Sequence, residues 1–186
     1  MFLSKMAALI IVDVQKAFDD PSWGQRNNPQ AETNIKQLLK KWRETERPVY
    51  HIQHVSKRSP SSLFYFEKET CEIKEEAKPL EGEPVLTKSV NSSFIGTHLE
   101  EFLRERGCDT VVVVGLTTNH CVETTTRMAG NLGFNTYLVS DATATFDRVG
   151  PDGRKYRAAD IHQMTLVNLH EEFATIVDTR SIIEML

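Results

Sequence analysis

The sequence contains a set of short apolar runs with the length of buried strands, and these runs limit the folds that the chain can adopt. Four consecutive valines stand within Thr110–Leu116, and Ala7–Val12 contains the run ALIIV. The remaining runs are weaker or shorter: Pro48–Ile52, Val85–Leu86, Thr136–Ser140 and Phe173–Val177. Strands that are apolar on both faces are typical of a parallel sheet covered on both sides.

Helical patterns lie between these runs. Two segments carry apolar residues on one helical stripe: Ala31, Ile35, Leu38, Leu39 and Trp42 in the first, and Ile95, Leu99, Phe102 and Leu103 in the second. The segment after Cys121 is compatible with a helix up to Gly130 or Gly133, and Arg154–Leu169 is a less regular helical stretch. The alternation predicts one α/β domain over residues 1–186, with a mostly parallel sheet.

Composition excludes several classes of protein. The net charge of -4 gives no electrostatic support for a nucleic-acid partner, and we expect no membrane partner because no apolar run has spanning length. The three cysteines, without a C-x-x-C pair, fit neither a disulfide framework nor a zinc knuckle. Asp13 interrupts the first apolar run, which is therefore a strand rather than a signal peptide, and we expect a cytoplasmic protein.

The segment Val55–Pro84 breaks the strand–helix alternation. It is long, charged and rich in Ser and Pro, yet it carries an apolar and aromatic cluster at Leu63–Phe66. Long loops in compact domains are usually functional or disordered, and the aromatic cluster argues against disorder. The segment could cover a pocket or contact a neighbouring subunit, and the sequence supports both interpretations equally.

Three reactive side chains follow three different strands. Asp13 ends the run LIIVD, Lys88 ends PVLTK, and Cys121 follows VVVVGLTTNH after a short turn. In open α/β sheets the ligand site lies beyond the carboxyl ends of the strands. Each residue alone is more often structural, but a carboxylate, an ammonium and a thiol directed to one edge together favour catalysis.

The surroundings of Cys121 predict how the thiol would be activated. We expect Thr118 or Asn119 to cap a helix with Cys121 in its first turn, where backbone N–H groups, the helix dipole and Lys88 would lower the thiol pKa. The same N–H groups could hold an oxyanion, and Asp13 could shuttle the proton. His120 does not face Cys121 along a helix, and His162 and His170 are interpreted as structural.

The stretches LIIVDVQKAF, PVLTKSVNSSFIGTHLEEFL and VVVVGLTTNHCVETTTRMAGNLGFNTYLVSDA resemble the isochorismatase-like cysteine hydrolases, a family that includes nicotinamidases and N-carbamoylsarcosine amidohydrolase. The resemblance implies a three-layer α/β/α Rossmann-like sandwich with a six-stranded parallel sheet and a triad of Asp13, Lys88 and Cys121. It also implies a non-proline cis peptide at Leu116–Thr117, an oxyanion hole formed by the amides of Thr117 and Cys121, and a dimer or tetramer.

The substrate pocket is expected among neighbours of the triad. The candidates are Gln15, Phe18, His54, Asn91, Ser92 and Phe94. Phe18 and Phe94 could equally belong to the core, and His54 could equally be a loop histidine. Phe64 and Phe66 could close over the pocket.

A metal site is not expected. Nicotinamidases of the family carry an Asp/His cluster after the second strand that binds a divalent ion, and here that region holds His51 and His54. Residues three apart on a strand face opposite sides of the sheet, so these two histidines cannot easily share one ion. We therefore predict no metal and no other cofactor.

These observations predict a hydrolase that cleaves an amide or ureido-type C–N bond of a small molecule through a thioester. An isochorismatase-type vinyl-ether hydrolase is the first alternative, although that reaction needs no nucleophilic cysteine. A non-catalytic binding protein on the same fold is the second alternative.

Overall fold

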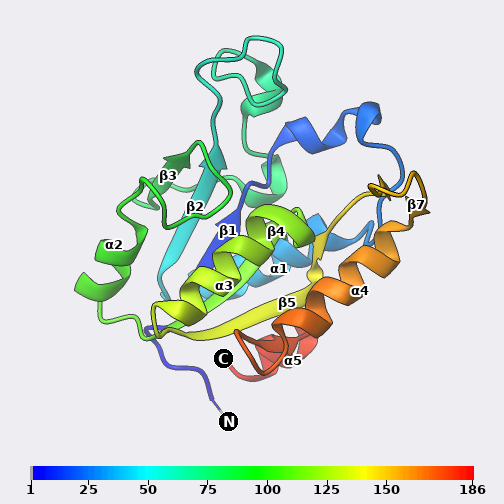
Figure 1. Cartoon of the computed structure of the whole chain (residues 1–186). Coiled ribbons are helices and arrows are strands. Elements are labelled where there is room, and N and C mark those ends of the chain that lie inside the picture. Colours follow the sequence, from blue (N-terminus) through cyan, green and yellow to red (C-terminus); the bar gives the residue numbers. More distant parts are fainter. Residues whose placement is uncertain (1) are drawn as a thin grey trace.

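The computed structural model describes residues 2–186, and a six-stranded sheet forms its centre (Figure 1). The strands are β1 (Ala8–Val12), β2 (Val49–His54), β3 (Val85–Lys88), β4 (Thr110–Leu116), β5 (Asn135–Ala144) and β8 (Thr175–Val177). They are arranged in the order β3-β2-β1-β4-β5-β8, and every pairing is parallel. The predicted α/β fold with a parallel sheet is confirmed.

Helices cover both faces of the sheet and give three layers. The helices α1 (Ala31–Glu44) and α5 (Thr179–Glu184) pack on one face, against Leu9 and Ile11 of β1. The helices α2 (Leu99–Glu105), α3 (Glu123–Asn131) and α4 (Ala158–Leu169) pack on the other, against Ala8 and Ile10. Successive residues of a strand point to opposite faces, so a continuous apolar run such as ALIIV supplies two cores at once.

The strand order reverses between β1 and β4. Strand β1 pairs with β2 on one side and with β4 on the other, and the chain crosses from β3, at one edge, back to the middle of the sheet to form β4. In open α/β sheets, ligands bind at such a reversal, outside the carboxyl ends of the strands. Asp13 directly follows β1, and the turn that carries Cys121 directly follows β4.

Some elements differ from the sequence-based expectation. Ile95 is exposed and precedes α2, so it does not share a helical stripe with Leu99. The expected helix Arg154–Leu169 begins only at Ala158, because the preceding residues form a two-stranded antiparallel ribbon, β6 (Arg148–Val149) and β7 (Lys155–Tyr156). Helix α5 was not expected at all.

The Val55–Pro84 segment projects from the carboxyl edge of the sheet and then returns to the body of the protein (Figure 1). Phe64 packs back against Phe18, with 5.3 Å between the ring centroids. Further along, the buried Lys74 pairs with Asp19 at 2.6 Å and with Glu32 of α1 at 2.8 Å. The segment therefore lies beside the predicted site, which supports the pocket-covering interpretation.

No helix within residues 2–186 has both the length and the hydrophobicity that a membrane crossing needs.

Gly115 allows β4 to lie close to β1 at the strand reversal. Its φ is +126°, and a Cβ atom at this position would stand 2.0 Å from the carbonyl oxygen of Val12. We expect Gly115→Ala to lower the free energy of unfolding by more than about 3 kcal/mol in a urea titration, because the two backbones must separate. Gly133→Ala is the matched control: its φ is +82° but the space is open, so its cost should be about 1–2 kcal/mol. Equal losses in the two variants would contradict this account.

Candidate active site

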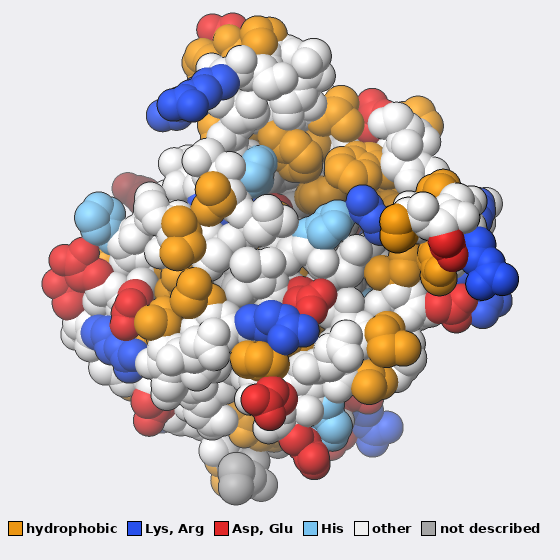
Figure 2. All heavy atoms as spheres, viewed as in Figure 1, with side chains coloured by type: hydrophobic (Ala, Val, Ile, Leu, Met, Phe, Trp, Pro, Cys, Tyr) orange, Lys and Arg blue, Asp and Glu red, His pale blue; other side chains and the backbone are white. Residues whose placement is uncertain are grey.

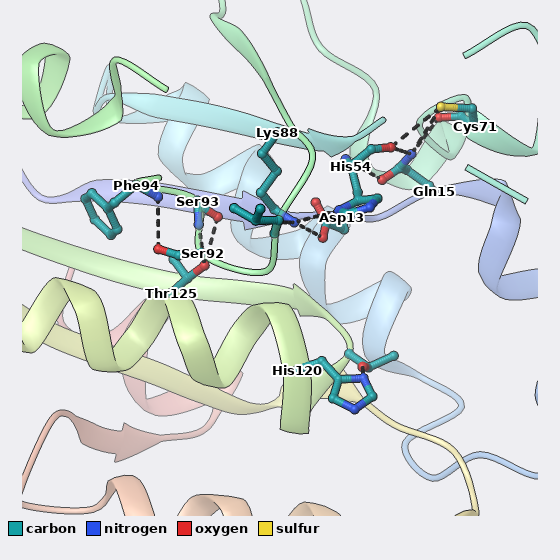
Figure 3. Close-up of polar contacts among 12 residues, drawn as sticks. Asp13, Gln15, His54, Cys71, Lys88, Ser92, Ser93, Phe94, His120 and Thr125 are labelled. Atoms are coloured by element: carbon teal, nitrogen blue, oxygen red, sulfur yellow. Dashed lines mark hydrogen bonds and ion pairs between the residues drawn. The ribbon is translucent and has the colours of Figure 1, made fainter. Parts of the chain in front are cut away.

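A buried ion pair lies at the carboxyl edge of the sheet. Lys88, the last residue of β3, donates from Nζ to Oδ2 of Asp13 at 2.6 Å, and the two side chains are 0% and 1% exposed. Nζ also donates to the carbonyl of Val90 at 3.1 Å and lies 3.3 Å from Nδ1 of His54. Figure 3 shows the Lys88 side chain directed towards Asp13. An ammonium has three protons, so these three contacts use all of its donors.

Asp13 is held in place by its backbone and has one free carboxylate oxygen. Its φ is +50°, and its N–H donates to the carbonyl of Ile52 at 3.0 Å. Oδ1 is buried and has no hydrogen-bond partner within residues 2–186. Burial raises the pKa of Asp13, while the charge of Lys88 opposes that rise. An unpartnered buried carboxylate oxygen is suited to accept a proton from a neighbour.

Cys121 comes to the same place from β4. It belongs to the π turn Thr118–Val122, which leads into α3, and its side chain is half-buried. Cys121, Asp13 and His54 each offer one polar atom, and these three atoms all lie within 4.8 Å of one another. The parallel topology thus brings together the carboxylate, the ammonium and the thiol that follow three separate strands.

The thiol of Cys121 is not acidic in the resting protein. Burial, followed by the nearby charge of Asp13, raises its pKa to about 12, and Lys88 only partly opposes this. The expected lowering of the thiol pKa is therefore wrong. The expected caps are wrong too, because Thr118 Oγ1 bonds to His162 Nδ1 at 2.9 Å and Asn119 Oδ1 accepts from Thr145.

The turn before Cys121 contains a cis peptide between Leu116 and Thr117. The carbonyl of Thr117 accepts from the N–H groups of His120 at 3.1 Å and Val122 at 3.3 Å. The ring of His120 lies 3.4 Å from the Thr117 hydroxyl, apart from Asp13 and Lys88 (Figure 3). The assignment of the Thr117 and Cys121 amides to an oxyanion hole stays a prediction.

A partly buried network that the sequence does not reveal positions this turn. Asn28 donates to the carbonyls of Ser140 and Thr143 at 3.0 and 2.7 Å, and its Nδ2 lies 3.5 Å from Nε2 of His162. The other ring nitrogen of His162 bonds to Thr118. His162 is structural, as interpreted, but its structural task is to hold the cysteine turn. Asn28 carried no sequence signal, because its partners lie more than a hundred residues away.

Gln15 does not offer polar atoms to a substrate, contrary to expectation. Its Nε2 donates to the carbonyls of His54 at 2.9 Å and Cys71 at 2.7 Å, and its Oε1 accepts from the His54 N–H at 2.8 Å (Figure 3). The side chain is completely buried. Gln15 therefore fixes the backbone of His54.

The residues after Lys88 lead away from the site (Figure 3). Phe94 stacks on Phe134, which precedes β5 at the opposite edge of the sheet, so its predicted substrate contact is wrong and the core alternative holds. Ser92 is buried, and its hydroxyl accepts from the Phe94 N–H at 3.2 Å, so it too serves the local turn. Asn91 is exposed, and its substrate contact stays a prediction.

Aromatic side chains form a wall beside the triad. Phe18 lies 5.2 Å from Trp23 and 5.3 Å from Phe64 between ring centroids, and Phe146 stacks on Trp23 at 5.3 Å. Leu116 belongs to the same cluster. Figure 2 shows hydrophobic side chains gathered in a hollow beneath the projecting segment, with histidine at its edge. Trp23 and Phe146 were missed because a single-turn helix, Pro21–Trp23, and an isolated β-bridge between Arg26 and Phe146 leave no periodic pattern in the sequence.

The proximity of Asp13, His54 and Cys121 raises the question of a metal ion. The ammonium of Lys88, at 2.6 Å from Asp13 and 3.3 Å from His54, already supplies the positive charge between these groups, and it would repel a divalent cation. His51 faces away and bonds through Nε2 to Glu83 at 2.8 Å. The residues therefore do not fit the nicotinamidase type of metal cluster, and the absence of a metal stays a prediction.

Comparison with known proteins identifies the family. Residues 7–181 match the isochorismatase domain. The chain belongs to the isochorismatase family of hydrolases. It is 56% identical to the uncharacterized isochorismatase family protein YrdC of Bacillus subtilis, over 97% of this chain and 96% of that protein. It is 32% identical to Nicotinamidase 3 of Arabidopsis thaliana, over 94% and 86%.

The fold comparison agrees with this assignment. A crystal structure of an isochorismatase-family protein from Chromobacterium violaceum superposes with a TM-score of 0.96 at 42% identity, covering 99% of this chain and 95% of that one. The similarity thus extends over the sheet and all the segments that build the site.

The raised pKa of Cys121 can be tested by thiol alkylation. We expect the rate of iodoacetamide modification of Cys121, followed by mass spectrometry, to keep rising with pH well beyond the ordinary thiol value of about 8.5. Asp13→Asn should lower the midpoint pH of this rate profile because a neighbouring negative charge is removed. Lys88→Met should raise the midpoint pH because a neighbouring positive charge is removed. A wild-type midpoint at or below the ordinary value would refute this description of the site.

Proposed function

We propose that this protein is a cysteine hydrolase that cleaves the C–N bond of a small-molecule amide or ureido compound through a thioester. The observation that carries the proposal is the buried Asp13–Lys88 pair beside Cys121, with one oxygen of Asp13 left without a hydrogen-bond partner among residues 2–186. A nucleophile, a proton acceptor and a fixed positive charge are the groups that acyl transfer from nitrogen to sulfur requires.

Activation of the thiol moves a proton without adding charge to the site. In the proposed step, the Cys121 thiol gives its proton to Asp13 as sulfur approaches the substrate. Before this step the buried charges are a carboxylate and an ammonium, and afterwards they are a thiolate and the same ammonium. A thiol with a pKa of about 12 can therefore act as nucleophile, because its proton moves directly to a neighbour and not to solvent.

The remaining steps use the same groups. Sulfur bonds to the carbonyl carbon, the C=O electron pair moves to oxygen, and the amides of Thr117 and Cys121 hold the oxyanion. When the C–N bond breaks, Asp13 returns its proton to the leaving nitrogen, and ammonia or an amine departs. Water then attacks the thioester and gives a proton to Asp13. The C–S bond breaks to release the acid, and that proton returns to sulfur.

The relatives support this class of reaction. The Arabidopsis relative is named as a nicotinamidase, which acts on an amide. Nicotinamide is therefore one of the first compounds to screen, together with other primary amides and ureido acids, with ammonia release as the signal.

Replacement of the nucleophile tests the proposal. We expect Cys121→Ala to reduce kcat on the best amide by about 10⁴-fold or more, since the thioester can no longer form. The matched control is Cys108→Ala, which removes a buried thiol that precedes β4 at the opposite edge of the sheet and should keep wild-type activity. Intact-mass analysis of the wild type during turnover should show the acyl adduct. Full activity of Cys121→Ala would refute the thioester route and favour vinyl-ether hydrolysis.

A further inference from the structure

His54 lies inside the site, although the thioester route does not use it. It is the last residue of β2 and is half-buried. Its Nδ1 lies 3.3 Å from Nζ of Lys88, and one of its ring nitrogens lies within 4.8 Å of both Asp13 and Cys121. Any group bound to the sulfur of Cys121 therefore comes close to this imidazole.

The contact with Lys88 determines where His54 carries its proton. An ammonium can only donate, so Nδ1 must accept, and the proton of the neutral ring lies on Nε2. Burial, followed by the charge of Lys88, lowers the pKa of His54 against the opposing effects of Asp13 and of the Val90 carbonyl, which keeps the ring neutral. Among the side-chain hydrogen bonds of residues 2–186, the ring takes part through Nδ1. The N–H at Nε2 is thus available to a ligand.

The ring is also held rigidly. Gln15 binds both the N–H and the carbonyl of His54, at 2.8 and 2.9 Å, and is itself anchored to the carbonyl of Cys71 at 2.7 Å. The imidazole meets the ring of Phe64 edge-on, at 5.2 Å and 75°. A donor fixed before the ligand arrives loses little conformational entropy on binding, and is therefore selective.

We propose that His54 determines substrate specificity: its Nε2–H donates a hydrogen bond to an acceptor atom that the substrate carries next to the scissile carbonyl. The substrate class is then an amide or ureido compound with a ring nitrogen or a second carbonyl adjacent to the reacting carbon. Analogues without this acceptor leave a half-buried donor unpaired and are rejected. The inference rests on the proposed function, because it places the reacting carbon at Cys121.

A pair of isosteric aldehydes tests the inference without knowledge of the natural substrate. Pyridine-2-carboxaldehyde carries a ring nitrogen next to its carbonyl, and benzaldehyde does not. With each of them the thiol adds across the C=O bond: sulfur bonds to carbon, the thiol proton moves to oxygen, and no atom is lost. Affinity is measured as protection of Cys121 from iodoacetamide.

Two substitutions separate the two nitrogens of His54. In His54→Asn the amide reaches the position of Nδ1 and can still accept from Lys88, but the donor at Nε2 is gone. In His54→Gln the longer side chain places an N–H near the position of Nε2. Unchanged alkylation of Cys121 without aldehyde shows that the site is intact in each variant.

We expect the wild type to bind the pyridine aldehyde more tightly than benzaldehyde. In His54→Asn the ratio of the two affinities should fall about tenfold, which is the effect of one hydrogen bond. His54→Gln should keep most of it. The intrinsic reactivities of the aldehydes cancel, because the same pair is compared across variants.

An unchanged preference in His54→Asn would overturn the role of His54 while leaving the thioester route intact. Failure of both aldehydes to protect wild-type Cys121 would count against the proposed function itself, and against this inference with it.

Discussion

The site is organised around the pairing of Lys88 with Asp13, whose side chains are both shielded from bulk solvent. Removing two charges from water costs several kcal/mol for each ion, and their attraction compensates only when the geometry is good and the remaining donors are satisfied. Here the separation is 2.6 Å, and the other donors of Lys88 meet Val90 and His54. The pair joins the ends of β1 and β3 across β2, so the positions of three strands determine it.

Two separate networks hold the surroundings of this pair. On one side, Gln15 ties the end of β2 to the projecting segment through the backbone of His54 and Cys71. On the other side, Asn28 and His162 hold Thr118 at the start of the cysteine turn. Between them, Gly115 allows β4 to approach β1 closely. The reactive groups therefore lie on rigid elements, and this limits the reorganisation that catalysis would need.

The fold and the placement of the main residues could be predicted from sequence for a physical reason. Buried parallel strands produce apolar runs that are visible locally, and parallel topology brings all their carboxyl ends to one edge. Asp13, Lys88 and Cys121 could thus be assigned to one place without any knowledge of their contacts. The edge at which a strand-end residue lies follows from chain direction alone.

Other properties depend on packing between distant segments and could not be predicted. Stacking on Phe134 determines where the Phe94 side chain points. The hydrogen bond to the carbonyl of Cys71 directs the side-chain amide of Gln15 away from a substrate. The thiol pKa was misjudged because the helix dipole and Lys88 were considered without the burial and the charge of Asp13 that outweigh them. The prediction of a helix cap at Thr118 was wrong for a similar reason, because its hydroxyl is hydrogen-bonded to His162 of α4.

Negative charge passes between the carboxylate of Asp13 and the sulfur of Cys121 beside the fixed ammonium of Lys88. This has a consequence for the effect of salt on the reaction. In the proposed route, the negative charge moves only between neighbouring atoms that are shielded from bulk solvent. Dissolved ions screen charges that face water far more than charges inside a protein. Ionic strength should therefore change how a charged substrate reaches the site while leaving the rate of bond breaking almost constant.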